Sequence, residues 1–196
     1  MKMLNAHPSL LPKYRGASPL QYTIMNEDPV GGVSIIDLDS RTFDAGNIWA
    51  RESFAIEQPI DVKVLEEKTA KISGKLFHGI LKDYTKYDQS KKPQEGPITM
   101  APKIERSQAF VSFERDRMMR IYSLYQALKT RENIHCKLAT GEEVMIIEML
   151  DPRNTYSKMH PQQFHDLTGT LSILISRAVI ITTTRFRGCS CWSHIT

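Results

Sequence analysis

The stretch that decides the fold is Leu4–Gly16, which reads LNAHPSLLPKYRG. Its first residues predict a short β-strand, in which Asn5 and His7 are two residues apart and therefore point to the same face. Pro8 ends this strand, because proline supplies no N–H to a sheet. The sequence thus predicts that Asn5 and His7 lie at a strand end above a rigid loop, where ligands bind in open α/β sheets.

An amide beside an imidazole suggests acyl-group chemistry. A tetrahedral intermediate needs a donor for its oxyanion and a group that exchanges a proton near neutral pH, and Asn5 and His7 supply these two groups. The best downstream carboxylate to orient the imidazole is Asp44, because Gly46 allows the backbone to turn tightly beside it. The alternative stays open that an Asn-x-His before a proline only caps a turn.

Several segments in this part of the chain resemble, in order, the folate-dependent formyltransferase family. They are residues 5–16, Ser18-Pro19, 31–35 and 43–48. In that family the Asn, His and Asp of these segments form the catalytic trio, so the resemblance implies this role for Asn5, His7 and Asp44. The chain departs from the commoner pattern at Phe43 and Ala45, where Leu and Thr are usual, and neither change affects the acid.

The same resemblance implies 10-formyltetrahydrofolate as the co-substrate and no metal. Asn5 would hold the formyl oxygen, His7 would stabilise or protonate the intermediate, and Asp44 would set the state of His7 and help to move protons. The substrate-binding residues implied by the resemblance are Ser9, Leu10, Leu11, Pro12, Arg15 and Gly16.

Composition argues against a membrane-spanning protein, a disulfide-rich protein and a zinc-binding protein. The chain has 196 residues, 41% of them hydrophobic, which is ordinary for a globular protein, and no apolar run approaches a membrane span. A net charge of +4 is compatible with a polyanionic partner. Cys136, Cys189 and Cys191 form neither a disulfide framework nor a zinc pattern, and the pair Cys189 and Cys191 with His194 lacks a fourth ligand at the usual spacing.

The order of the elements predicts two domains. We expect a helix from Ser18 to Met25, strands over 32–39 and 47–56 with Asp44 on the loop between them, and a long helix over 61–84 that carries His78 as a surface or packing residue. Residues 86–99 are charged and rich in Pro and Gly, which predicts a linker. Residues 1–85 would then be the C-terminal half of a formyltransferase catalytic domain, with a Rossmann-like parallel sheet.

Residues 100–196 would form a second domain. Residues 101–104 resemble the segment that leads into the C-terminal domain of family members acting on methionyl-tRNA. A helix is expected over 115–128, a hairpin over 135–150, and β-rich runs over 170–184. The predicted fold class is therefore α/β, with the C-terminal part of a Rossmann-like formyltransferase domain followed by a small OB-like β-barrel, left incomplete by a tail that does not continue the family pattern.

Three arginines of the predicted helix, Arg115, Arg117 and Arg120, lie off its apolar stripe. They form either a solvated face or a surface that contacts tRNA phosphates.

The function implied by the resemblance is transfer of a formyl group from 10-formyltetrahydrofolate to the amino group of initiator methionyl-tRNA, for translation initiation. The second domain favours this reading, because the purine-precursor enzyme of the family normally ends after its catalytic domain. Relatives that formylate a purine precursor or an amino sugar, or hydrolyse the folate, remain alternatives, as does an inactive fragment or RNA-binding remnant.

The chain is expected to be a monomer and to act in the mitochondrion, with the cytoplasm as the alternative. Because its catalytic strand begins at about residue 3, the chain is expected to begin inside a domain and to be inactive without further sequence upstream.

Overall fold

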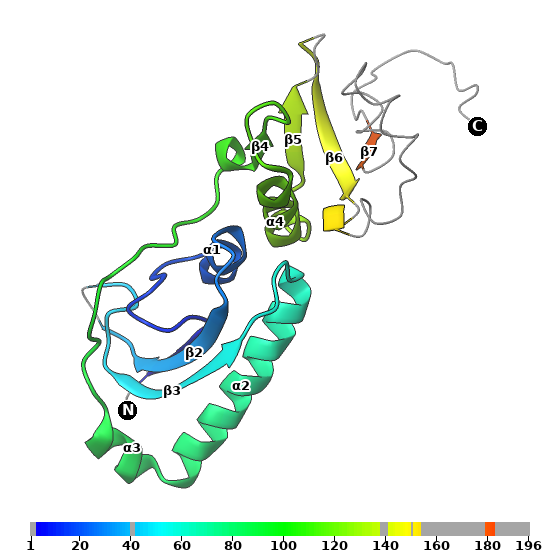
Figure 1. Ribbon diagram of the computed structural model, residues 1–196. Helices are drawn as coiled ribbons and strands as arrows, with labels where there is room; N and C mark the ends of the chain where they lie inside the picture. Colours follow the sequence, from blue (N-terminus) through cyan, green and yellow to red (C-terminus); the bar gives the residue numbers. More distant parts are fainter. Residues whose placement is uncertain (1–2, 40–41, 138–140, 150, 154–178, 183–196) are drawn as a thin grey trace, which may run out of the picture.

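The computed structural model describes residues 3–39, 42–137, 141–149 and 151–153, and the backbone of 179–182. Figure 1 shows one region built on a sheet that holds β1, β2 and β3, a second region built on another sheet, and the helices α1 and α4 between them. The elements in chain order are β1 (Leu4–His7), α1 (Pro19–Met25), β2 (Val30–Asp37), β3 (Ile48–Ala55), α2 (Val62–Lys82), α3 (Tyr84–Ser90), the 3-10 helix η1 (Arg106–Ala109), β4 (Phe110–Val111), α4 (Met118–Leu128), β5 (Ile134–Lys137), β6 (Glu143–Met149) and β7 (Val179–Thr182).

The first sheet has the order β1-β2-β3, and both of its pairings are antiparallel. This corrects, for these three strands, the parallel arrangement expected of a Rossmann-like sheet. The connection from His7 to Val30 returns the chain to the end of the sheet where β1 finished, so β2 runs back along β1. The strands and the short helix α1 otherwise begin and end within a few residues of their predicted limits.

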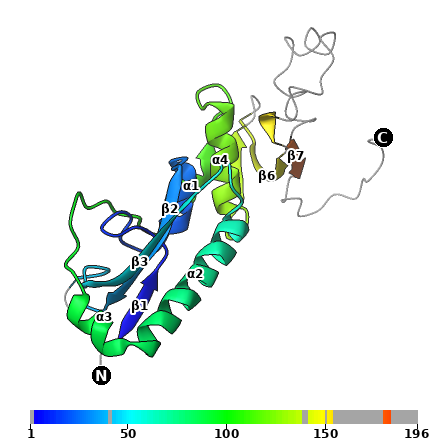
Figure 2. The same cartoon turned by 60° about the horizontal axis from the view of Figure 1, so that its bottom comes forward.

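Helix α2 covers one face of this sheet, as Figure 2 shows. Val33, Ile35 and Ile80 are fully buried between them. Burying such a side chain contributes roughly 1.5–3 kcal/mol to the free energy of folding, so this apolar layer stabilises the packing of the sheet against the helix. The helix predicted over 61–84 is confirmed, although it ends at Lys82 and a second short helix, α3, follows.

The predicted linker is largely ordered. Helix α3 extends to Ser90, and the connecting segment that follows it (residues 91–105) is held by backbone hydrogen bonds. Lys92 and Ile48 bond each other through both N–H groups, at 2.7 and 3.0 Å, and Arg15 donates its N–H to Thr99 O at 2.9 Å. The charged, breaker-rich composition predicted a linker, and these long-range bonds hold the segment against the first region.

The second sheet has the order β4-β5-β6-β7. β4 runs parallel to β5, and the other pairings are antiparallel, which confirms the predicted hairpin as β5 and β6. Closure of this sheet into an OB-like barrel stays a prediction, because residues 154–178 and 183–196 lie outside the described part of the chain. Cys189, Cys191 and His194 lie there too.

One hydrophobic core crosses the predicted domain boundary. Helix α1 and the first turns of α2 pack against α4 and the second sheet. The residues before and after the connecting segment are therefore joined by buried apolar surface and not only by the chain. The fully buried residues at this junction include Ile24, Val62, Leu65, Ile121 and Leu128.

An ion pair between helix ends lies beside this core. Asp61 is the N-cap of α2, where one carboxylate oxygen accepts the Lys63 N–H at 2.8 Å and the other lies 2.6 Å from Lys129 Nζ at the C-cap of α4. Burial acts to raise the pKa of Asp61, but Lys129 and the Lys63 N–H outweigh it, so the pKa is lowered. Both charges also have the favourable sign for their helix end.

Asp61→Ala should lower the free energy of unfolding by about 1–2 kcal/mol at pH 7, because it removes both the cap and the ion pair. Asp61→Asn keeps a good cap and should cost less. A carboxyl with a lowered pKa in the folded state contributes stability above its unfolded pKa, about 3.9, and loses it as the pH falls through the folded value. The gap between the parent and Asp61→Asn should therefore close as the pH falls through the lowered pKa that Asp61 has in the folded state.

Urea denaturation followed by circular dichroism measures these differences. Glu67→Gln changes an exposed carboxylate of the same helix and is the matched control, expected within about 0.5 kcal/mol of the parent. If Asp61→Ala is as stable as this control, the ion pair and cap do not hold the junction.

Candidate functional site

Asn5 and His7 lie on the face of the first sheet opposite to α2. In the pairing of β1 with β2, Asn5 faces Ile36 and His7 faces Ser34, whereas Leu4 and Ala6 pack toward the core under α2. His7 is buried and Asn5 is half-buried. The prediction that both side chains share one face is confirmed.

Asp44 reaches both of these side chains from the loop between β2 and β3. Its Oδ1 lies 3.5 Å from Asn5 Nδ2, and its Oδ2 lies 3.6 Å from His7 Nδ1, within ion-pair distance when the imidazole is protonated. The turn itself has its left-handed residue at Asp44, where φ is 52°, a conformation that Asp tolerates better than most residues. Gly46 is required for a different reason, since a Cβ there would overlap the Asp37 carbonyl oxygen.

Gly16 closes the site from the other side. Its N–H donates to Asp44 Oδ2 at 2.9 Å, and its φ of 122° is one that residues with a side chain rarely adopt. A Cβ at this position would also stand 2.6 Å from the Ala101 carbonyl oxygen. The glycine that ends the opening stretch therefore holds the carboxylate beside the imidazole.

The His7 ring has one nitrogen whose role is fixed. Nε2 lies 2.8 Å from the Tyr14 carbonyl oxygen, and a carbonyl can only accept. Nε2 must therefore carry a proton, and Nδ1 is the nitrogen that faces Asp44. The geometry places an imidazole nitrogen beside a carboxylate, with the amide of Asn5 next to them.

Tyr14 is itself strongly constrained. It has a φ of 63°, and its hydroxyl donates to Asp28 Oδ2 at 2.7 Å while accepting from Asn26 Nδ2 at 2.7 Å. Burial raises the pKa of Tyr14; the Asn26 bond opposes this shift and the nearby Asp28 carboxylate adds to it, so the hydroxyl keeps its proton and remains a donor. Tyr14 N–H also donates to Thr99 Oγ1 of the connecting segment at 2.9 Å.

The predicted substrate-binding residues fall into two groups. Ser9, Leu11 and Pro12 are buried, and Ser9 Oγ donates to Lys13 O at 2.6 Å. These buried side chains therefore stabilise the structure of the loop itself. The half-buried members of the set are Leu10, Arg15 and Gly16.

Ser34 fixes this loop to the sheet and was not among the predicted residues. Its hydroxyl accepts the Leu11 N–H at 3.1 Å and donates to Ser9 O at 2.8 Å, with none of its surface exposed. Gln94, which contacts the Asp44 loop, was also missed. The alternation of β2 could have indicated that Ser34 shares the face of His7, but no local signal indicates Gln94.

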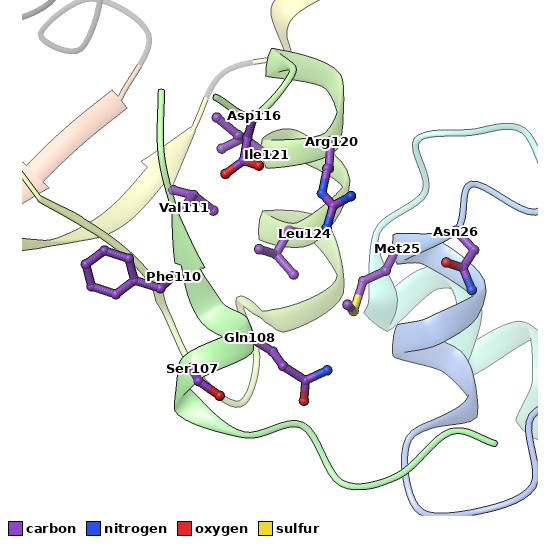
Figure 3. A pocket seen from close by; sticks show the side chains of 10 residues that line it. All are labelled: Met25, Asn26, Ser107, Gln108, Phe110, Val111, Asp116, Arg120, Ile121 and Leu124. Atoms are coloured by element: carbon purple, nitrogen blue, oxygen red, sulfur yellow. The ribbon is translucent and has the colours of Figure 1, made fainter. Parts of the chain in front are cut away.

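The three predicted RNA-contacting arginines are brought together. Arg115, Arg117 and Arg120 are exposed and line one cavity of about 690 Å³ between the end of α1 and the start of α4. A second cavity of about 270 Å³ adjoins it, and Figure 3 shows Arg120 extending from α4 toward Met25 and Asn26 at the end of α1. Neither cavity is lined by the three residues at the end of β1 and in the Asp44 loop.

A membrane-spanning helix is not found in the described part of the chain, where no helix has both the length and the apolar composition required.

The chain matches known proteins in sequence and in fold. The family model described as formyl transferase matches residues 1–81. A methionyl-tRNA formyltransferase of Finegoldia magna is 33% identical over 138 residues, which are 70% of this chain and 44% of that protein. A mitochondrial methionyl-tRNA formyltransferase of Bos taurus is 31% identical over 128 residues, 64% of this chain and 33% of that protein. The chain thus spans between a third and about half the length of the first of the curated relatives it matches.

Solved structures share the fold. A methionyl-tRNA formyltransferase from Clostridium thermocellum matches with a TM-score of 0.61 and 19% identity, over 78% of this chain and 64% of that one. HypX from Aquifex aeolicus, solved in complex with tetrahydrofolic acid, matches with a TM-score of 0.63 and 22% identity, over 77% of this chain and 26% of that one. The family model and the relatives above 30% identity show that residues 1–81 belong to the formyltransferase family, and the solved structures show that the fold is shared.

Proposed function

We propose that this chain is the part of an enzyme that transfers a formyl group from 10-formyltetrahydrofolate to the amino group of methionyl-tRNA. The observation that carries the proposal is the convergence of Asn5, His7 and Asp44 at one end of the first sheet. The names of the relatives from Finegoldia magna and Bos taurus support the acceptor, and the tetrahydrofolate complex of HypX supports a folate donor.

Each of the three residues has a role that its contacts allow. The amine nitrogen attacks the formyl carbon, and the carbonyl oxygen becomes an oxyanion. His7 donates from Nδ1 to this oxygen, since its Nε2 proton is held by Tyr14. Asn5 has two amide N–H donors, of which one is directed at Asp44 and the second serves the oxyanion.

Asp44 takes part in the proton balance. The attacking amine must lose one proton, and the folate nitrogen must gain one as its bond to the formyl carbon breaks. Asp44 accepts the proton that the amine loses and passes it to the folate nitrogen as that nitrogen leaves the formyl carbon, so the protons balance. The Gly16 N–H supports the negative charge of Asp44 before the first transfer and after the second.

The second region would bind the tRNA. Three exposed arginines line one cavity, and guanidinium groups suit phosphates because they donate two parallel hydrogen bonds. An OB-like arrangement of residues 100–196 would fit this role. We also propose a mitochondrial location and a monomeric state; the mitochondrial relative from Bos taurus supports the location, and bacterial relatives match as well.

His7→Ala should reduce formyl transfer by ~10²-fold or more, because it removes the group that exchanges a proton and stabilises the oxyanion. The assay uses a chimaera in which the aligned 138 residues of this chain replace their counterparts in the Finegoldia magna relative, and it follows formylation of methionyl-tRNA. The 196-residue chain is assayed beside it, which tests the expectation that it is inactive by itself.

His78→Ala is the matched control, since His78 is an exposed histidine of α2. It should leave the rate within a few-fold of the parent. A rate for His7→Ala that matches this control would refute the catalytic assignment, and transfer to a nucleotide amino sugar in place of methionyl-tRNA would refute the proposed acceptor.

Replacing Arg115, Arg117 and Arg120 together with Glu should weaken binding of tRNA by the 196-residue chain. The slope of log affinity against log salt should fall by about one unit for each arginine that contacts a phosphate. Lys71, Lys82 and Lys86 are exposed residues of α2 and α3, and their replacement with Glu changes the net charge equally. If the two triple variants have the same affinity and slope, the arginines form only a solvated face.

A further inference from the structure

Gln94 lies in the connecting segment, more than thirty residues beyond the last β-strand of the first sheet, and yet it touches the loop that carries Asp44. Its Nε2 donates to Asp44 O at 2.7 Å and to Gly46 O at 3.0 Å. Its Oε1 accepts from Arg15 Nε at 3.1 Å and from Arg15 Nη2 at 2.6 Å. One half-buried amide thus joins the Asp44 loop to the end of the opening stretch.

These contacts allow a single orientation of the amide. A guanidinium can only donate, so it must face the side-chain oxygen, and two backbone carbonyls can only accept, so they must face the NH₂ group. The two bonds to Arg15 involve a charged donor and are stronger than ordinary ones. The NH₂ group is consequently held in place against the two carbonyls of the turn.

The turn needs such support. Asp44 has a φ of 52°, which costs free energy for any residue except glycine, and the carbonyls on either side of Ala45 point at one donor group. From the opposite side Gly16 N–H binds the Asp44 carboxylate, and Gly16 is the neighbour of Arg15 in the chain. Gln94 and Gly16 therefore hold the backbone and the side chain of the same residue.

We propose that Gln94 is a positioning residue, which keeps the Asp44 carboxylate beside His7 by fixing the backbone of its loop. The proposal rests on the proposed function for its catalytic meaning. On this proposal the connecting segment contributes a residue to the active site, in addition to joining the first region to the second.

The first measurement is amide hydrogen exchange by NMR on the 196-residue chain. The Gly16 N–H reports the position of the Asp44 carboxylate, and the N–H of the buried core residue Leu65, bonded to Asp61 O in α2, serves as the reference for the stability of the rest of the fold. Gln94→Leu should lower the protection of the Gly16 amide about tenfold or more relative to that of Leu65, because two hydrogen bonds to the turn are lost.

Gln94→Glu separates the two halves of the contact. The substitution keeps the length of the side chain and its bonds to Arg15, but it places a carboxylate oxygen against the carbonyls of Asp44 and Gly46. It should lower the Gly16 protection at least as much as Gln94→Leu does. Gln89→Leu and Gln89→Glu are matched controls at an exposed position of α3 and should leave it unchanged.

Retention of parent-like Gly16 protection in Gln94→Glu would overturn the proposal, since it would mean that Gln94 only anchors Arg15. This readout is independent of formyl transfer and so separates failure of this proposal from failure of the proposed function. In the active chimaera, Gln94→Glu should lower kcat about tenfold with little change in KM for methionyl-tRNA. An unchanged kcat would also overturn it.

Discussion

The site depends on the register of β1 against β2. With His7 opposite Ser34 and Asn5 opposite Ile36, the polar side chains of β1 face the loop and its apolar side chains face α2. A shift of one residue would turn Asn5 and His7 into the apolar layer and Leu4 and Ala6 toward Asp44. The buried contacts of Leu4, Ala6 and Ile35 under α2 therefore secure the position of the polar face as well as the stability of the sheet.

Polar contacts then hold the opening loop over this face. Ser34 binds the loop from the sheet, Tyr14 binds it from within, and Thr99 and Gln94 bind it from the connecting segment. Each hydrogen bond contributes about 1 kcal/mol, but leaving one of these buried groups unpaired would cost more. Backbone groups of the loop are thus bonded both to the sheet and to the connecting segment, and these bonds fix its position.

Local pattern was enough to predict much of the first region. Because Asn5 and His7 are two residues apart in a predicted strand, they could be placed on one face, and the turn residues around Asp44 placed it on a loop. The capping residue Asp61 and the apolar periodicity after it predicted α2. Local pattern did not predict the antiparallel pairing, the ordered connecting segment, or the core shared by α1 and α4. These features arise from contacts between residues far apart in the sequence, which composition and periodicity do not encode.

The sequence signal for the site was also uneven. Ser34 lies in a β-rich run, where a serine is an ordinary strand residue. Gln94 lies in a stretch of charged residues and prolines that is typical of a linker. Both act through hydrogen bonds to backbone groups, so neither requires a recognisable pattern around it. Arg115, Arg117 and Arg120 were predictable as an exposed group, whereas the cavity they line depends on how α1 meets α4.

The most direct test of the account is the protonation of the two ring nitrogens of His7, measured by nitrogen-15 NMR on the histidine-labelled chain. We expect that Nε2 carries a proton at neutral pH, because it donates to the Tyr14 carbonyl, and that Asp44→Asn changes the Nδ1 signal far more than the Nε2 signal. An unprotonated Nε2 at neutral pH, or an Nδ1 signal that ignores Asp44→Asn, would contradict the arrangement from which the chemistry is derived.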